Sequence, residues 1–346
     1  MTADAFALPY PLLLEGGGVL DAVSVAYRTW GTLDASRSNA VLICHALTGN
    51  ANADEWWEPL IGAGRSLDPD RDFIVCSNIL GSCYGTTGPA DSRSPFPRIT
   101  IRDMVALQRA LLPHLGVKRI RLVIGGSLGG MQTLEWALAE PDLVDAIAPI
   151  TTSARHNAWQ IAISESQRRA IFADPAWLDG DYEADRPPRD GLAVARMIAM
   201  ISYRSHSSFA SRFGREERAG EFEVEEWLRH HGEKLVARFD ARSYVALTRA
   251  MDTHDVGRGR GGTEAALRSI VQPALVVSVN SDVLYPPIEQ EELAALIPRA
   301  RFEVLASENG HDAFLIDMEE LNQIVTDFRA RVERESCQTK GTQRCA

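Results

Sequence analysis

The sequence predicts an α/β fold in which a mostly parallel central sheet is flanked by helices and interrupted by a helical insertion. Apolar runs of strand length alternate with stretches of helical periodicity in the first half of the chain and again near its end. This alternation is typical of parallel sheets that are covered on both faces. Between about residues 152 and 262 the buried strands stop and helical patterns dominate. Residues 121–137 also combine an apolar strand, a glycine-rich turn around Ser127 and a helix.

The predicted elements follow in order along the chain. Two short strands, at residues 9–14 and 23–27, precede two buried strands at 39–45 and 72–78. A helix is predicted at 100–115 because apolar residues recur there at helical spacing, up to Gly116. The remaining elements are a strand at 122–124, a helix from 130, a strand at 144–150, insertion helices at 161–172, 191–203, 224–239 and 243–251, a strand at 272–280, a helix at 288–297, a strand at 301–305 and a helix at 321–332.

Length and composition limit the function classes. The chain has 346 residues, is 45% hydrophobic and carries a formal net charge of −11. It can therefore bury a large core, and its charge argues against nucleic acid or an anionic membrane as a partner. No signal peptide is expected, and no apolar run approaches the roughly 20 residues that span a bilayer. The five cysteines form no CxxC pair and no Cys/His cluster has ligand spacing, so we expect free thiols in a reducing compartment and no metal site.

Residues 125–129 (Gly-Gly-Ser-Leu-Gly) fit the G-x-S-x-G pattern of a nucleophile elbow. Glycines on both sides of Ser127 allow a sharp turn between strand and helix, which exposes the serine hydroxyl at the end of the sheet. The free N–H groups and the positive dipole end of the following helix point at the same place. The pattern alone is weak because Gly and Ser are common in loops, but the flanking strand and helix make Ser127 the candidate nucleophile.

A serine nucleophile needs a base to take its proton, and the base needs an acid to orient it. In proteins with this elbow, the order along the chain is Ser, then Asp or Glu, then His. Asp282 directly follows the strand at 272–280, and His311 follows the strand at 301–305, so both belong to the carboxyl edge of the sheet. Taken singly, Asp282 would be interpreted as a turn former and His311 as a surface residue. In this order and context, the three residues predict a catalytic triad.

Acyl chemistry also needs donors for a developing oxyanion. The backbone N–H of Leu128, the residue after the nucleophile, is one candidate, and the N–H of Leu47, in the loop after the strand at 39–45, is the other. His45 begins that loop, and we expect it to shape the loop rather than to titrate in catalysis. Cys83 lies in a second match to the elbow pattern, residues 81–85, but no amphipathic helix follows it. Cys83 is therefore expected to be a loop residue near the site at best.

Several further motifs accompany the triad. They include residues 45–49 (His-Ala-Leu-Thr-Gly), 83–89 (Cys-Tyr-Gly-Thr-Thr-Gly-Pro), 124–132 (Ile-Gly-Gly-Ser-Leu-Gly-Gly-Met-Gln), 203–205 (Tyr-Arg-Ser), 281–286 (Ser-Asp-Val-Leu-Tyr-Pro) and 310–315 (Gly-His-Asp-Ala-Phe-Leu). Together they resemble the homoserine O-acetyltransferases, a family with the α/β-hydrolase fold. The resemblance extends from about residue 8 to 330, through both the core and the insertion. Other hydrolases of this fold share the triad but not these intervening motifs.

The resemblance implies transfer of an acetyl group from acetyl-CoA to the side-chain hydroxyl of L-homoserine, on the way to methionine. It implies acetyl-CoA as co-substrate and no bound cofactor. It also implies that Arg204 and Asp312 bind the amino-acid substrate, since a guanidinium suits a carboxylate and an aspartate can pair with an ammonium. Without the family, a helix arginine with a solvated head and a helix-capping aspartate would be the simpler interpretations. Such enzymes are cytoplasmic homodimers that pair through the helical insertion.

These expectations divide the chain into an α/β-hydrolase core at residues 1–151 and 266–334, a helical lid and dimerisation insertion at 152–265, and a flexible tail at 335–346. The sequence departs from the family pattern at Leu128, where Met is frequent, and at Ser82, where the family often has Gly. Close relatives acylate serine or use succinyl-CoA, and an ester or lactone hydrolase would use the same triad. The donor and the acceptor therefore stay open alternatives. The glycine-rich loop at 257–262 has no phosphate-binding context.

Overall fold

The computed structural model describes residues 3–91 and 96–342, and its centre is an eight-stranded sheet. The sheet contains β1 (Asp4–Ala7), β4 (Ser24–Trp30), β5 (Ala40–Cys44), β6 (Phe73–Ser77), β7 (Ile120–Gly126), β8 (Ile147–Ile150), β11 (Ala274–Val279) and β12 (Ala300–Leu305). The strand order is β1-β4-β6-β5-β7-β8-β11-β12. The strands from β6 to β12 in this order are parallel, whereas β1 and β4 complete one edge in antiparallel pairing. The predicted fold class is confirmed.

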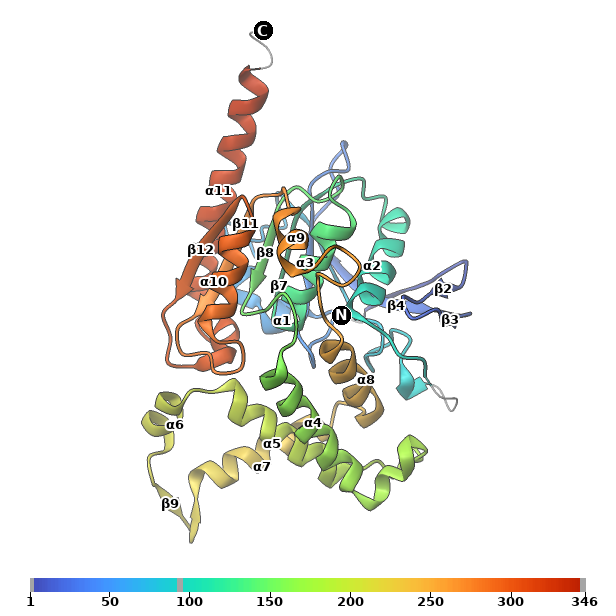
Figure 1. Ribbon diagram of the computed structural model, residues 1–346, viewed down its shortest axis with the longest axis vertical. Coiled ribbons are helices and arrows are strands. Elements are labelled where there is room, and N and C mark those ends of the chain that lie inside the picture. The colour runs from blue at the N-terminus through green and yellow to red at the C-terminus, as the bar shows by residue number, and fades with distance from the viewer. Residues whose placement is uncertain (1–2, 92–95, 343–346) are drawn as a thin grey trace.

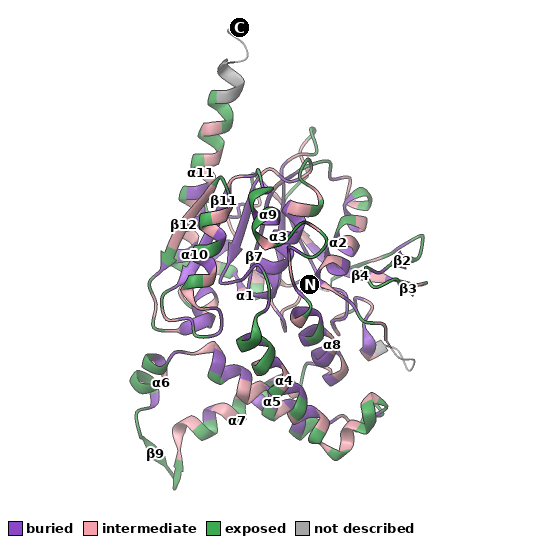
Figure 2. Ribbon diagram, viewed as in Figure 1, coloured by how far each residue is buried: buried purple, intermediate pink, exposed green. Residues whose placement is uncertain are grey.

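Helices cover both faces of this sheet (Figure 1). They are α1 (Ala53–Trp56), α2 (Ile101–Leu115), α3 (Leu128–Ala139), α9 (Thr263–Arg268), α10 (Pro287–Leu296), α11 (Met318–Thr342) and the short 3-10 helices η1 (Glu58–Leu60), η2 (Pro89–Asp91) and η4 (Gly310–Leu315). Alternate residues of β5 point to opposite faces. Leu42 joins the core cluster under α2, α3 and α10, and Ile43 joins the cluster under α1 and α11. The buried strands between these two layers stand out in Figure 2.

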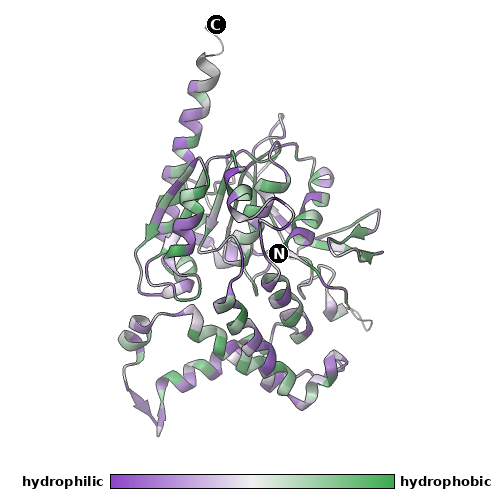
Figure 3. Cartoon of the chain, viewed as in Figure 1, coloured by the Kyte–Doolittle hydropathy of each residue, from purple (hydrophilic) through white to green (hydrophobic). Residues whose placement is uncertain are grey.

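The insertion forms a separate helical layer at one end of the core (Figure 1). It contains α4 (Ala158–Ala173), η3 (Pro175–Gly180), α5 (Arg189–Tyr203), α6 (His206–Phe213), the small hairpin of β9 (Glu217–Arg218) and β10 (Glu221–Phe222), α7 (Glu223–Val236) and α8 (Ala241–Asp252). Helix α4 packs on α5, and α5 packs on α7. Hydrophobic and hydrophilic residues are interspersed along these helices (Figure 3), as expected of helices with one buried side.

Some predicted elements differ from the structure. The strand predicted at 9–14 is only β2 (Leu12–Leu13), which pairs with β3 (Val19–Leu20) outside the main sheet. Helix α6 was not predicted because it is short and polar, although its cap is visible in the sequence: the Ser205 hydroxyl accepts a hydrogen bond from the Ser208 N–H. The last helix was predicted to end at residue 332, but α11 continues as far as Thr342 and so includes most of the predicted tail. The rest of that tail, residues 343–346 with Cys345, lies outside the described residues.

None of the helices within residues 3–91 and 96–342 combines the length and apolarity needed to cross a membrane. The same residues contain no group of three His, Cys, Asp or Glu side chains that could hold a metal ion. Cys44, Cys76, Cys83 and Cys337 are free thiols, and the first two are buried.

Candidate active site

Ser127 lies at the sharp turn between β7 and α3. Its φ of 58° and ψ of −123° belong to a region that non-glycine residues rarely adopt, so the elbow is a strained conformation held by its surroundings. The Ser127 N–H donates to the Ile150 carbonyl at 3.0 Å, and the Thr152 hydroxyl donates to the Ser127 carbonyl at 2.9 Å. The end of β8 and the residues after it thus hold both backbone polar groups of Ser127.

The glycines around Ser127 are required by close packing. A Cβ on Gly129 would lie 2.0 Å from the Cys44 carbonyl oxygen, and one on Gly126 would lie 2.5 Å from the ring of Phe314. The first contact packs the start of α3 against the end of β5. The second packs the elbow against η4, the segment that carries His311.

Asp282 and His311 form a buried pair at the carboxyl ends of β11 and β12. Asp282 Oδ2 accepts a hydrogen bond from His311 Nδ1 at 2.7 Å, and both residues are 3% exposed. Asp282 Oδ1 accepts the backbone N–H groups of Leu284 and Tyr285 at 2.8 and 2.9 Å. These bonds fix the orientation of the Asp282 carboxylate. Because the carboxylate accepts the hydrogen on Nδ1 of His311, Nε2 is the ring nitrogen that can act as a base.

Nε2 of His311 has no hydrogen-bond partner among the described residues, and Ser127 Oγ is not bonded to it. Catalytic hydrogen bonds of this kind are often long without substrate and tighten in the reacting complex. Ser127 follows β7, while Asp282 and His311 follow β11 and β12, so all three lie at the carboxyl ends of parallel strands.

Aromatic rings surround His311. The ring centroids of Tyr285, Tyr203 and Phe314 lie 5.1, 5.7 and 5.7 Å from that of the imidazole. Tyr203 ends α5 of the insertion, so the insertion contributes directly to the environment of the His311 imidazole. We did not single out Tyr203 or Tyr285 from the sequence, although both lie in segments that carried the resemblance.

The two predicted oxyanion donors lie on adjacent segments. Within the part of the chain that the structure describes, the N–H groups of Leu47 and Leu128 donate no hydrogen bond. Gln132 Nε2 reaches the carbonyl oxygens of His45 and Leu128 at 3.4 and 3.2 Å and so links the two segments. Both N–H groups are therefore free to receive a substrate oxygen.

His45 shapes the first of these segments. Its Nε2 accepts the Ile79 N–H at 3.1 Å, and its Nδ1 lies 2.8 Å from the Ala46 carbonyl oxygen. A neutral imidazole with hydrogen on Nδ1 satisfies both contacts. Burial lowers the pKa of His45 to about 4, which keeps the ring neutral. The structure agrees with the expectation that His45 has a structural role in this loop.

Arg204 and Asp312 lie beside this centre and face each other. Arg204 Nε is 3.5 Å from Asp312 Oδ2, and the Arg204 guanidinium also donates to Asn309 at 3.3 Å. Burial raises the pKa of Asp312, an effect that Arg204 opposes, and burial lowers the pKa of Arg204. Because Asp312 directly follows His311, the structure brings an anion and a cation together next to the His311 imidazole.

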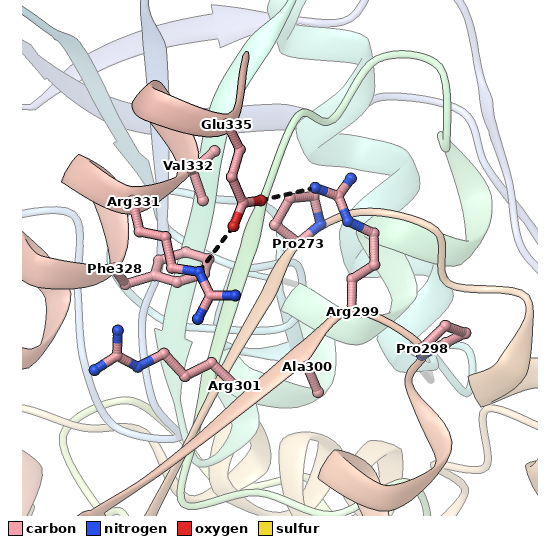
Figure 4. Close-up of a pocket in the computed structure, with 9 residues that line it drawn as sticks. All are labelled: Pro273, Pro298, Arg299, Ala300, Arg301, Phe328, Arg331, Val332 and Glu335. Carbon is pink, nitrogen blue, oxygen red and sulfur yellow. Dashed lines mark hydrogen bonds and ion pairs between the residues drawn. The ribbon is translucent and has the colours of Figure 1, made fainter. Parts of the chain in front are cut away.

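A small cavity lies between the core and the insertion. Leu47 and Tyr285 line it from the core, and Tyr203 of α5 lines it from the insertion together with residues of α4 and α8. A second hollow, shown in Figure 4, lies at the opposite, amino ends of β11 and β12. There Arg299 and Arg331 both bind Glu335, at 3.1 and 2.8 Å. This hollow lies at the opposite end of the strands from Asp282 and His311, so it is not part of the candidate active site.

Two other sequence features have structural explanations. Cys83 is half-buried in a loop, and burial raises the pKa of its thiol to about 11, which makes it a poor nucleophile. The glycine-rich loop is tied to the core by arginines: Arg260 binds Glu135 at 2.8 Å and Arg258 binds Glu15 at 2.7 Å. These ion pairs connect the end of the insertion to α3 and to the N-terminal segment.

Known proteins resemble this chain in both sequence and structure. A family model described as "alpha/beta hydrolase fold" matches residues 39–317. The homoserine O-acetyltransferase of Trichormus variabilis is 61% identical over 335 residues, which cover 94% of this chain and 93% of that protein. Esterase E22 superposes with a TM-score of 0.87 at 26% identity and covers 94% of this chain and 99% of its own. The homoserine O-acetyltransferase from Bacillus anthracis, with a TM-score of 0.87 at 24% identity and coverage of 95% and 98%, shares the fold. The resemblance of the motifs is confirmed, and this chain belongs to the homoserine O-acetyltransferase family of the α/β-hydrolase superfamily.

Proposed function

We propose that the protein transfers the acetyl group of acetyl-CoA to the side-chain hydroxyl of L-homoserine, on the way to methionine. The observation that carries this proposal is the position of Arg204 and Asp312 beside the Asp282–His311 pair. Such a cation and anion can bind the carboxylate and the ammonium of one amino acid. A simple esterase has no need of them, whereas an amino-acid acceptor has to be held with its hydroxyl at the acyl group.

In the first half-reaction Ser127 Oγ attacks the thioester carbonyl while His311 Nε2 takes its proton. The carbonyl oxygen becomes an oxyanion that the N–H groups of Leu47 and Leu128 stabilise. When the intermediate collapses, the C–S bond breaks, the proton passes from His311 to the departing thiolate, and CoA leaves. The acetyl group remains as an ester on Ser127.

In the second half-reaction the homoserine hydroxyl attacks this ester. His311 removes the hydroxyl proton as the new C–O bond forms, and it returns that proton to Ser127 Oγ as the ester bond to the enzyme breaks. Arg204 and Asp312 orient the acceptor. The insertion covers the carboxyl edge of the sheet and places Tyr203 against the base, which limits access of water to the acetyl-enzyme.

Steady-state rates with acetyl-CoA or succinyl-CoA as donor and L-homoserine or L-serine as acceptor test the proposal. We expect fast CoA release with acetyl-CoA and homoserine, and little release when no acceptor is present. Ser127→Ala is expected to abolish the transfer. Faster turnover with serine or with succinyl-CoA would assign the enzyme to the corresponding alternative.

An ester hydrolase is the second candidate, because esterase E22 has the same overall fold at 26% identity. A hydrolase would release CoA, or nitrophenol from 4-nitrophenyl acetate, at a rate that homoserine does not change. A transferase would convert the acetyl-enzyme to O-acetylhomoserine when homoserine is added. Identification of the acetylated product by mass spectrometry therefore separates the two.

The insertion is also the proposed homodimer interface of a cytoplasmic enzyme. Large apolar side chains are exposed on its helices, including Val194 and Ile201 one heptad apart on α5 and Ile161 on α4. Exposed apolar residues that share a helix face favour a protein interface. Light scattering should give the mass of a dimer, and Ile201→Glu should shift it towards the monomer. Leu13→Glu, an exposed position on the β2–β3 hairpin, is the matched control. A monomeric wild-type protein would contradict this proposal.

A further inference from the structure

A second buried histidine lies close to the catalytic pair, in the segment that leads from β8 into the insertion. His156 Nε2 is 2.6 Å from the hydroxyl of Tyr285, and His156 Nδ1 is 3.5 Å from Asp252 Oδ1. The other oxygen of Asp252, the last residue of α8, binds Arg168 of α4 at 2.6 Å. The reaction described above uses none of these side chains.

The chemistry of this cluster favours one arrangement of its protons. His156 Nδ1 and Asp252 Oδ1 lie 3.5 Å apart and have no hydrogen-bond partner among the described residues, so they form a close polar contact and not a hydrogen bond. A carboxylate attracts an N–H group, so the hydrogen of the neutral His156 ring belongs on the nitrogen that faces Asp252. Burial lowers the pKa of His156, and in the neutral ring Nε2 then accepts the hydrogen bond of the Tyr285 hydroxyl. Arg168 balances the charge of Asp252. The order Asp252, His156, hydroxyl of Tyr285 thus repeats that of Asp282, His311 and Ser127, but with a tyrosine that lies completely inside the protein.

Tyr285 connects this cluster to the catalytic acid and base. Its backbone N–H binds Asp282 Oδ1 at 2.9 Å, and its ring lies 5.1 Å from that of His311 at an angle of 33°. The preceding residue is held in the same way, because the Leu284 N–H binds Asp282 Oδ1 at 2.8 Å and its carbonyl accepts Gln160 of α4 at 2.9 Å. The orientation of Asp282 therefore depends on backbone groups whose position is set from the insertion.

We propose that the buried Asp252–His156–Tyr285 chain positions the catalytic acid: it holds Tyr285 so that Asp282 presents Oδ2 to His311. His156 and the Tyr285 hydroxyl are positioning groups in this proposal, and they contact no substrate. The proposal rests on the function proposed above only in taking Ser127, Asp282 and His311 as the reacting triad. It makes the insertion part of the catalytic machinery as well as a cover over the site.

Acetyl-enzyme formation with 4-nitrophenyl acetate tests the proposal without depending on the natural acceptor. Tyr285→Phe removes the hydroxyl but keeps the ring and the backbone N–H. We expect it to lower the rate constant of the nitrophenol burst about tenfold, the effect of one well-placed buried hydrogen bond, with KM changed less than about twofold because no substrate contact is lost. His156→Asn should have a similar effect. The burst rate constant of the double variant should be no lower than those of the single variants, because both changes remove the same hydrogen bond between His156 and Tyr285.

Tyr244→Phe is the matched control. Tyr244 is also completely buried, and its hydroxyl binds Gln167 of α4 at 3.0 Å, but among the described residues no hydrogen bond or ring contact joins it to the Asp282 loop. Its burst rate should stay within about twofold of the wild type. An unchanged rate in Tyr285→Phe, an equal loss in Tyr244→Phe, or an additive loss of about a hundredfold in the double variant would overturn the proposal. If His156→Asn does not fold, the comparison of the two tyrosine variants still decides. A failure of homoserine as acceptor would refute the proposed function and leave this test intact.

Discussion

The contact between Gly129 and Cys44 gives the sharpest prediction from this structure. A Cβ at position 129 would lie 2.0 Å from the Cys44 carbonyl oxygen and 2.9 Å from its carbon. These are backbone atoms, so no rotation of a side chain relieves the clash. Cβ atoms tolerate a shortest approach of about 3 Å, so Gly129→Ala has to move α3 away from β5 by about 1 Å.

This separation would act on the two proposed oxyanion donors. Leu128 directly precedes Gly129, and Leu47 follows Cys44 by three residues, so the two N–H groups would move apart. A misplacement of about 1 Å at a reacting centre costs on the order of a hundredfold in rate, and overpacking costs about 1–3 kcal/mol of stability. We expect Gly129→Ala to lower kcat about a hundredfold and to reduce the thermal stability.

The rate would be measured as homoserine-dependent CoA release with a thiol reagent, and folding would be checked by thermal unfolding. Gly16→Ala is the control, because a Cβ there would meet nothing within 4 Å, and both its rate and its stability should match the wild type. A folded Gly129→Ala enzyme with nearly normal kcat would refute the reasoning that the β5–α3 contact holds the donors in place.

Three further predictions follow from the site. Asp282→Asn should lower kcat about 10⁴-fold, because the amide stabilises the wrong tautomer of His311; a loss below about tenfold in a folded variant would argue against the triad. Arg204→Lys keeps the positive charge but loses the two parallel N–H donors of the guanidinium, so it should raise KM for homoserine about tenfold or more with little change in KM for acetyl-CoA. Equal changes in both KM values would contradict a role of Arg204 in binding the acceptor. The buried His45 has a pKa of about 4 in the folded state, against about 6.5 in the unfolded chain. Between these two values the unfolded state binds more protons than the folded state, so the free energy of unfolding falls as the pH is lowered from about 6.5 towards about 4. Denaturant unfolding at pH 7 and pH 5 should show that the wild type loses about 2 kcal/mol more than His45→Gln, and parallel losses would show that His45 is not buried in its neutral form.

Much of the fold and of the candidate site could be predicted from local patterns. The elbow at Ser127, and the positions of Asp282 and His311 after strands, are properties of short segments, and they were visible because apolar strands and glycine turns have strong local signals. The helix α2 was predicted nearly to the residue because its apolar residues recur at helical spacing and because Gly116, with φ of 75°, ends it. The short polar helix α6 and the length of α11 were missed, since neither has a continuous apolar stripe.

By itself, then, the sequence determined the α/β class, the order of the candidate triad residues and, through its motifs, the family. Only the tertiary structure decided which side chains share the site with the triad. Tyr203 from the insertion and Tyr285 from the core meet at His311, Arg204 reaches Asp312 from 108 residues away along the chain, and His156 connects Asp252 to Tyr285. Contacts between residues so far apart in the chain depend on how the insertion packs on the core, and the periodicity of a single segment holds no information about the partner that it will meet.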